Sequence, residues 1–302
     1  MERGEPVVKK RRQSIGSRVF DTANIVFMLF LLFVTAYPMY FVIIASFSDP
    51  TQLWLNPGAL WLPLQPFTLE GYRMVFSNPL ITSGFLNTLF ILVVGVSINL
   101  AMTVLTAYGL SIRGPMLKTA LTFMIIFTMY FSGGLVPKYL NVKDLGLLNS
   151  LWSLILPGAL STTNMVIMKS AMTSIPDSLS ESARIDGASY FRILVSIVLP
   201  LCGPTIAVMV LYYGVGHWNS WFNASIYLTD RFKYPLQLVM RNILDSAQTA
   251  AMLGDTSADD MARYVDLIKY ALIVVTTAPI LVLYPFLQRY FVKGVMIGAI
   301  KE

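Results

Sequence analysis

The charged residues best placed to do chemistry lie in one polar stretch, residues 175–200, which separates two long apolar blocks. Ser178 and Glu181 have the spacing of a capping box, in which a hydroxyl and a carboxylate each accept a backbone N–H near the start of a helix. We therefore expect a short helix over residues 179–186. Because its polar side chains would be costly in hydrocarbon, this helix should lie at a membrane surface.

The residues that follow predict a sharp bend. Gly187 can adopt positive φ without steric cost, which suits the end of a helix. Ser189 can cap a second helix, which we expect to run through Ile193 and Val198 into the bilayer. The stretch therefore predicts a bent pair of helices joined rigidly to a membrane-spanning helix.

The run E-S-A-R-I-D-G-A at residues 181–188, followed by I-V-L-P at 197–200, resembles the EAA signature of ABC importer permeases. The aspartate before the glycine and the chain end L-Q-R-Y-F-V-K-G-V-M-I-G-A-I-K-E are similar to the MalG-like permeases of carbohydrate importers. Ser182 stands where the signature has its first alanine, and serine is small enough to keep close helix packing possible. The similarity covers most of residues 83–302 and implies the type I ABC importer transmembrane fold.

In that family the bent segment is a cytoplasmic coupling helix that docks into a cleft on a separate ATPase subunit. The resemblance implies that Glu181 makes a charged contact with the ATPase. We expect Gly187 to form the bend and Asp186 to support the turn or to cap it. Arg184 is implied to contact either the ATPase or lipid headgroups. The ATPase-coupling residues implied by the resemblance are Glu181, Ser182, Ala183, Arg184, Asp186 and Gly187.

The composition predicts a polytopic membrane protein. The chain has 302 residues, of which 56% are hydrophobic and 13% charged, and its mean hydropathy is +0.65. A soluble domain of this length could not bury so much apolar surface. A single cysteine, Cys202, excludes an internal disulfide. The net charge of +6 does not indicate a nucleic-acid partner, because the basic cluster at residues 9–12 precedes the first apolar run and reads as a cytoplasmic anchor.

Hydropathy predicts an all-α fold with six transmembrane helices. A bilayer core needs about 20 apolar residues for each helix. Most of the lysine and arginine residues fall on one side of such a topology, which places both the N-terminus and the C-terminus in the cytoplasm. The same orientation places residues 175–200 in the cytoplasm. The six segments are 23–47, 84–110, 117–135, 148–168, 194–215 and 271–291.

We expect three parts along the chain. Residues 1–82 would form a basic tail, the first transmembrane helix and an outer loop. Residues 83–292 would form the core permease domain, with five transmembrane helices and the coupling segment 176–200. Residues 293–302 would form a cytoplasmic C-terminal tail.

Two groups of residues could line a path for a sugar. Gly133 and Gly134 interrupt the end of the third segment, and broken backbone at membrane depth is tolerated only against protein or a water-filled cavity. At the end of the fifth segment, aromatic rings could stack on sugars and amides could bind hydroxyl groups. An aromatic belt at the outer interface is the alternative interpretation. The candidate path residues are Tyr130, Phe131, Tyr213, His217, Trp218 and Asn219.

Other polar residues in the apolar segments have structural interpretations. Asn87 and Asn99 lie in a glycine-containing segment, so we expect them to join helices rather than bind sugar. His217 is the only histidine and has no cysteine or carboxylate at ligand spacing, so we expect no metal site.

The sequence has no G-x-x-x-x-G-K-[ST] motif and no nucleophile–base pair, so we do not expect an enzyme. Hydrolysis of ATP, with its Mg²⁺, would belong to partner ATPase subunits, and this chain would bind no cofactor. A secondary transporter or channel is the alternative function. Such proteins commonly hold ionisable residues within their spans, whereas the central parts of the six segments contain none.

The resemblance also implies an assembly in the bacterial cytoplasmic (inner) membrane. The chain would form a heterodimer with a second, MalF-like permease and contact two ABC ATPase subunits and membrane lipid. An extracytoplasmic solute-binding protein would deliver a sugar or oligosaccharide, and no nucleic acid is involved. The expected function is that of one permease subunit of an ATP-driven carbohydrate importer.

Overall fold

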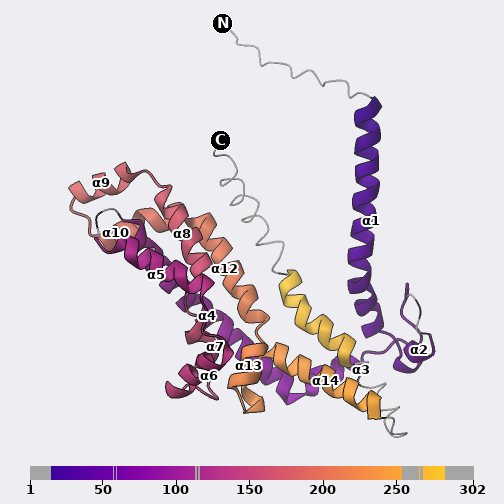
Figure 1. The fold of residues 1–302 in the computed structure, drawn as a ribbon. Helices are drawn as coiled ribbons and strands as arrows, with labels where there is room; N and C mark the ends of the chain where they lie inside the picture. Colours follow the sequence, from indigo (N-terminus) through magenta and orange to yellow (C-terminus); the bar gives the residue numbers. More distant parts are fainter. Residues whose placement is uncertain are drawn as a thin grey trace.

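The computed structural model describes residues 15–253, 265 and 268–282, apart from residues 57, 59, 113 and 115. Within these ranges the regular secondary structure is entirely helical (Figure 1). The elements are α1 (Ile15–Ser46), α2 (Pro50–Leu55), α3 (Glu70–Ser77), α4 (Pro79–Ser111), α5 (Lys118–Tyr130), α6 (Leu135–Asp144), α7 (Trp152–Ile155), the 3₁₀ helix η1 (Leu156–Gly158), α8 (Thr162–Thr173), α9 (Asp177–Ile185), α10 (Tyr190–Ile193), the π-helix η2 (Leu194–Val198), α11 (Leu199–Leu201), α12 (Gly203–Trp218), α13 (Phe222–Tyr227), the 3₁₀ helix η3 (Arg231–Lys233), α14 (Leu236–Leu253) and the helix Ile268–Val282.

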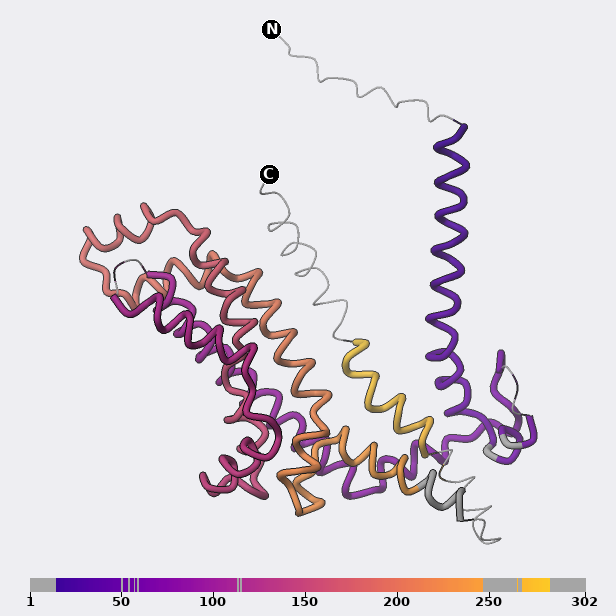
Figure 2. The backbone as a smooth tube through the Cα atoms, viewed as in Figure 1, coloured from indigo at the N-terminus to yellow at the C-terminus, as the bar shows by residue number. Residues whose placement is uncertain are grey.

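Helix α4 is the centre of the bundle. Figure 2 follows its course from the neighbourhood of α3 to that of α10, and along this length it packs against α14, α12 and α8. Its buried positions recur every three or four residues, which places them on one face of the helix. Several of them are small or polar, and such residues allow close helix packing in membranes. The buried residues are Ile81, Gly84, Thr88, Ile91, Gly95, Asn99, Thr103, Ala107 and Leu110.

Among the residues that the structure describes there are two candidate membrane spans, or up to four if each of two bent helix pairs is one span. α1 and α4 are long and apolar enough to cross a bilayer alone. The pair α5–α6, bent by 117°, and the pair formed by Tyr190–Leu201 and α12, bent by 83°, qualify only if each pair is taken as one span. The structure therefore does not confirm six spans. The predicted fourth segment is divided among α7, η1 and α8, and the predicted sixth is described only as far as Val282.

The expected break after the third segment is confirmed. α5 ends at Tyr130, residues 131–134 are not helical, and Gly134 has a φ of 86°. A positive φ is accessible to glycine at little cost, so the chain can turn sharply into α6 here.

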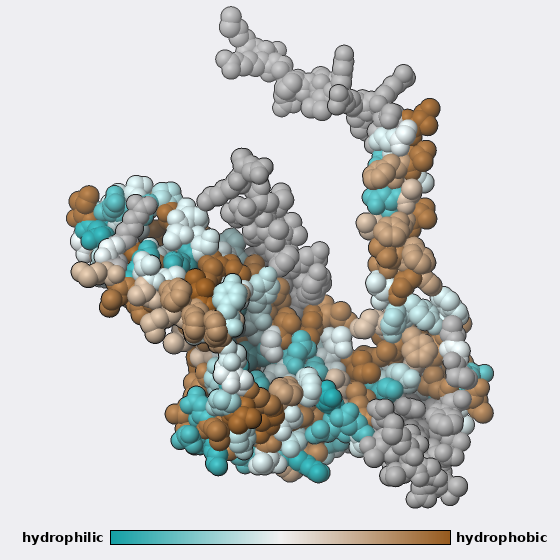
Figure 3. Space-filling view, in the orientation of Figure 1, coloured by the Kyte–Doolittle hydropathy of each residue, from teal (hydrophilic) through white to brown (hydrophobic). Residues whose placement is uncertain are grey.

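Helix α1 stands apart from the other long helices, and Figure 3 shows apolar side chains along it. Ala45 and Ser46 are its buried residues, at the end nearest the bundle. The loop after α2 folds back along α1, and its Trp61 ring lies 5.5 Å from Tyr37 and 6.0 Å from Phe33 between centroids. Exposed apolar side chains around a long helix are stable in lipid, so α1 suits a membrane environment.

Candidate functional site

The polar stretch predicted from the sequence forms an elbow, which we define as residues 177–193. Its first helix, α9, starts two residues earlier than expected, and the predicted capping box is wrong. Pro176 is the N-cap and makes no side-chain hydrogen bond, while Ser178 lies inside the helix, where its carbonyl accepts the Ser182 hydroxyl at 2.9 Å. Asp177 instead occupies the first turn, where its negative charge is favoured by the helix dipole.

The bend of the elbow is a glycine-dependent helix end. Gly187 has a φ of 81°. Its N–H donates to the Arg184 carbonyl at 3.0 Å, and the Ala188 N–H donates to the Ala183 carbonyl at 2.9 Å. These two bonds form a Schellman motif, which satisfies carbonyls that the helix leaves unpaired. The predicted end at Gly187 is therefore confirmed.

The second helix of the elbow starts as predicted. The Ser189 side chain accepts the Arg192 N–H at 3.3 Å and caps α10. From Tyr190 to Leu201 the chain is helical without interruption, and at Cys202 it bends by 83° directly into α12. No extended linker therefore separates the elbow from α12.

The surface of α9 is suited to contact another protein. It has no buried residue, and the Ile185 side chain is 87% exposed. Phe191, in α10, is 68% exposed. Of the six predicted coupling residues, Ala183 packs against the bundle core and the others are exposed. Apolar anchors beside charged groups are typical of binding surfaces.

The inner side of the elbow is braced against the bundle. The Tyr108 hydroxyl, near the end of α4, donates to the Tyr190 carbonyl at 3.0 Å. The Arg184 guanidinium lies 5.2 Å from the centroid of the Tyr190 ring. A cavity of about 210 Å³ remains between α9 and the ends of α4 and α8, with Glu181 and Lys118 in its lining. These contacts join the elbow to the end of α4, and the chain itself joins it to α12.

The six candidate path residues lie on two separate parts of the chain. Tyr130 ends α5 and is 76% exposed, and Phe131 follows it and stacks on Phe127 at 4.2 Å between centroids. The other four belong to α12 or its C-cap. Tyr213 and Trp218 are buried, His217 is half-buried and Asn219 is exposed.

Trp218 fills a site between α4 and the helix Ile268–Val282. It is 5% exposed, its indole N–H donates to the Thr276 carbonyl at 3.2 Å, and its ring lies edge-on to Phe85 at 6.4 Å. In this conformation the ring offers no open face to a sugar.

Comparison with known proteins gives the family. No protein-family model matches the chain. It is 40% identical over 286 residues to Protein LplC of Bacillus subtilis (strain 168), which covers 95% of this chain and 96% of that protein. It is 39% identical over 287 residues to the polygalacturonan/rhamnogalacturonan transport system permease protein YtcP of the same organism, with coverage of 94% and 99%. The chain belongs to the sugar ABC transporter permeases.

A solved structure supports the same assignment at the level of the fold. The permease is similar to a chain in the crystal structure of a bacterial ABC transporter involved in the import of the acidic polysaccharide alginate. The TM-score is 0.83 at 28% identity, and the match covers 92% of this permease and 99% of that chain. The protein is therefore a permease subunit of an ABC sugar importer and resides in the bacterial cytoplasmic membrane.

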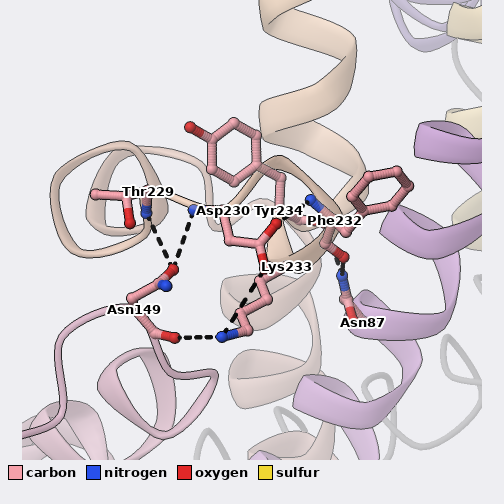
Figure 4. A network of polar contacts seen from close by, with 7 residues as sticks. All are labelled: Asn87, Asn149, Thr229, Asp230, Phe232, Lys233 and Tyr234. Carbon is pink, nitrogen blue, oxygen red and sulfur yellow. Dashed lines mark hydrogen bonds and ion pairs between the residues drawn. The ribbon is translucent and has the colours of Figure 1, made fainter.

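At the opposite end of the permease from the elbow, a polar network holds the loop that contains η3 (Figure 4). The Asn149 side-chain oxygen accepts the N–H groups of Thr229 and Asp230 at 3.2 and 3.0 Å. The Lys233 ammonium donates to the Asn149 carbonyl at 2.9 Å. Asn87 of α4 donates to the Phe232 carbonyl at 2.7 Å, which confirms its expected role between elements. The sequence does not single out Asn149, whose only local signal is its place in a turn.

Replacing Trp218 by alanine tests whether its ring packs or binds sugar. We expect Trp218→Ala to lower the thermal unfolding temperature of the purified permease in detergent, because emptying a buried aromatic site costs about 3–5 kcal/mol. Trp218→Phe, which loses the hydrogen bond but keeps a ring, should have a smaller effect. Trp152→Ala is a control, because Trp152 is 40% exposed. An unchanged unfolding temperature together with an altered transport KM would favour the path interpretation.

Proposed function

We propose that the elbow is the part of this permease that couples sugar import to ATP hydrolysis on partner subunits. The observation that carries the proposal is the exposed α9, with Ile185 beside charged Glu181 and Arg184, joined to α12 without an extended linker. A partner protein that binds this surface can displace α12, because the chain connects α9 to α12 without an extended linker. The chemistry of hydrolysis remains on the partner, so ATP and Mg²⁺ bind there and not to this chain.

We also propose an orientation of the permease in the membrane. The end of the bundle that carries α9 faces the cytoplasm, and six spans cross the membrane with both termini inside. The basic residues at 9–12 support this orientation, since such clusters remain on the cytoplasmic side. Figure 1 also supports it, because the Ile15 end of α1 and the elbow lie on the same side of the molecule. The C-terminal tail, residues 293–302, lies outside the described residues, and its cytoplasmic location is proposed from the sequence alone.

The assembly proposed for the permease has three kinds of partner. A second permease completes the sugar path, two ABC ATPases dock on the elbows of the two permeases, and an extracytoplasmic binding protein delivers the sugar. The two permeases alternate between inward-open and outward-open arrangements, and differential contacts with the ATPases shift the balance between them.

An acidic oligosaccharide is the proposed cargo. The relative YtcP is named for polygalacturonan and rhamnogalacturonan transport, and the similar solved transporter is described as an importer of the acidic polysaccharide alginate. Uptake of a labelled neutral sugar that is not inhibited by oligogalacturonate would contradict this part of the proposal.

Affinity purification tests the coupling role. The permease should be recovered with an ATP-hydrolysing subunit and a second permease, and the variants Glu181→Lys and Ile185→Asp should lose the ATPase. Glu70→Lys is a matched control, because Glu70 is an exposed acid on α3, far from the elbow in sequence. Recovery of the permease alone, with transport in liposomes that needs no ATP, would favour a secondary transporter.

A further inference from the structure

A ladder of polar side chains connects α4 with α12 in the middle of the bundle. Asn99 and Thr103 lie one turn apart on α4, and Tyr213 and His217 lie one turn apart on α12. The Nε2 atom of His217 is 2.7 Å from the Oδ1 atom of Asn99. The hydroxyls of Thr103 and Tyr213 are 2.6 Å apart. Asn99 and Thr103 are fully buried, and the bond between Thr103 and Tyr213 is shielded from water.

The same side chains hold the break between η1 and α8. The Asn99 amide nitrogen donates to the carbonyls of Gly158 and Ala159 at 2.7 and 3.0 Å. The Ser161 N–H donates to the Tyr213 hydroxyl at 3.2 Å. A helix that breaks inside a membrane protein leaves backbone groups that need partners. The ladder residues supply these partners, so they join α4, α12 and the break between η1 and α8.

The geometry determines which ring nitrogen of His217 carries the hydrogen. Because the Asn99 nitrogen donates to two carbonyls, its Oδ1 atom is the one that faces His217 and accepts a hydrogen bond. The Nε2 atom of His217 must therefore carry the hydrogen. The imidazole acts as a hydrogen-bond donor between two helices.

Gly95 provides the space for this ring. A Cβ atom at Gly95 would lie 2.7 Å from the Nε2 atom of His217 and 3.0 Å from its Cε1 atom. Gly95 is one turn before Asn99 on the buried face of α4. A larger residue at position 95 would require the imidazole or α4 to shift from the position in which His217 and Asn99 are hydrogen-bonded.

We infer that these five residues form a coupling node that makes α12, α4 and the η1–α8 break move as one unit. His217 and Asn99 are positioning residues of the transport cycle, and Gly95 sets the position of the His217 ring. The inference rests on the proposed function, in which the elbow drives α12. The node passes that displacement to α8, which packs against both α4 and α12.

Four variants of the assembled importer test the node by the rate of sugar transport and the ATP hydrolysed per sugar. Gly95→Ala displaces the ring and His217→Phe keeps a ring without a donor, so each should lower transport about tenfold and raise ATP use per sugar. His217→Gln keeps an N–H donor on a narrower side chain and should transport within about twofold of wild type. The double variant Gly95→Ala with His217→Gln should recover transport relative to Gly95→Ala alone.

The control is Gly109→Ala, because a Cβ at this position of α4 meets no atom within 4 Å. If Gly95→Ala does not assemble, His217→Phe decides, since it adds no atoms to α4. Normal transport by His217→Phe, or a Gly95→Ala defect that His217→Gln does not relieve, would overturn the node. If Glu181→Lys abolishes transport but His217→Phe does not lower it, the node is wrong and the proposed function stands. If neither variant lowers transport, the proposed function itself is wrong.

Discussion

Replacing Gly187 by proline will strongly lower sugar uptake while the permease still inserts into the membrane. Gly187 has a φ of 81°, whereas proline is restricted to a φ near −65° and has no N–H to donate to the Arg184 carbonyl. The Schellman motif cannot form, so α9 loses its direction relative to α10. We expect uptake to fall to about a tenth or less of wild type and ATP hydrolysis to stop responding to sugar.

The surroundings of Gly187 make the experiment specific to the backbone. A Cβ at this position meets no atom within 4 Å, so a substitution acts through φ and not through a clash. Gly187→Asn is the matched control, because asparagine tolerates positive φ and should retain most uptake. Gly187→Val should resemble the proline variant. Wild-type uptake by Gly187→Pro, measured at equal amounts in the membrane, would remove the elbow from the coupling mechanism.

Features set by neighbouring residues could be predicted from the sequence. The glycine bend and the Ser189 cap depend on residues within one helical turn, and both are confirmed. The capping box predicted at Ser178 is wrong because Pro176, two residues earlier, is already the N-cap of the helix. Pro176 has a ψ of 129°, so α9 begins directly after it and Ser178 is already inside the helix.

Hydropathy located the apolar segments but not their interruptions. It averages over about 20 residues, so a break of three or four residues does not alter it. The break at residues 131–134 was predicted because two glycines precede a proline there. At the break 159–161 the sequence offers only Pro157 and Gly158, which favour a kink, because the groups that stabilise a true interruption come from α4 and α12.

The polar partners across the bundle could not be predicted. Asn87 and Asn99 were expected to join helices, since an amide in an apolar segment needs a partner. Which partner each one finds depends on the fold: Asn99 meets His217 across 118 residues, and Asn149 meets Thr229 across 80. In the sequence His217 is a lone ring in an aromatic cluster, whereas in the fold it lies against Gly95 and hydrogen-bonds Asn99.

Replacing Asn149 by valine will destabilise the end of the permease opposite the elbow. Asn149 has a φ of 55°, a conformation that asparagine tolerates and that a β-branched residue rarely adopts. Valine also removes the oxygen that accepts the N–H groups of Thr229 and Asp230. The backbone strain and the lost hydrogen bonds together should cost about 2–3 kcal/mol, measured as a lower thermal unfolding temperature in detergent.

Two further variants separate the strain from the hydrogen bonds. Asn149→Gly relieves the strain but lacks the oxygen, so it should lie between valine and wild type. Asn149→Asp keeps both an acceptor and tolerance of positive φ, and should be close to wild type. Hydrogen–deuterium exchange gives the local measurement, because the amides of Thr229 and Asp230 should exchange faster in the valine and glycine variants only. Equal exchange in all four proteins would mean that Asn149 does not hold the η3 loop. Faster exchange limited to these amides, with the elbow unchanged, would show that the network in Figure 4 stabilises this end of the bundle independently of the coupling segment.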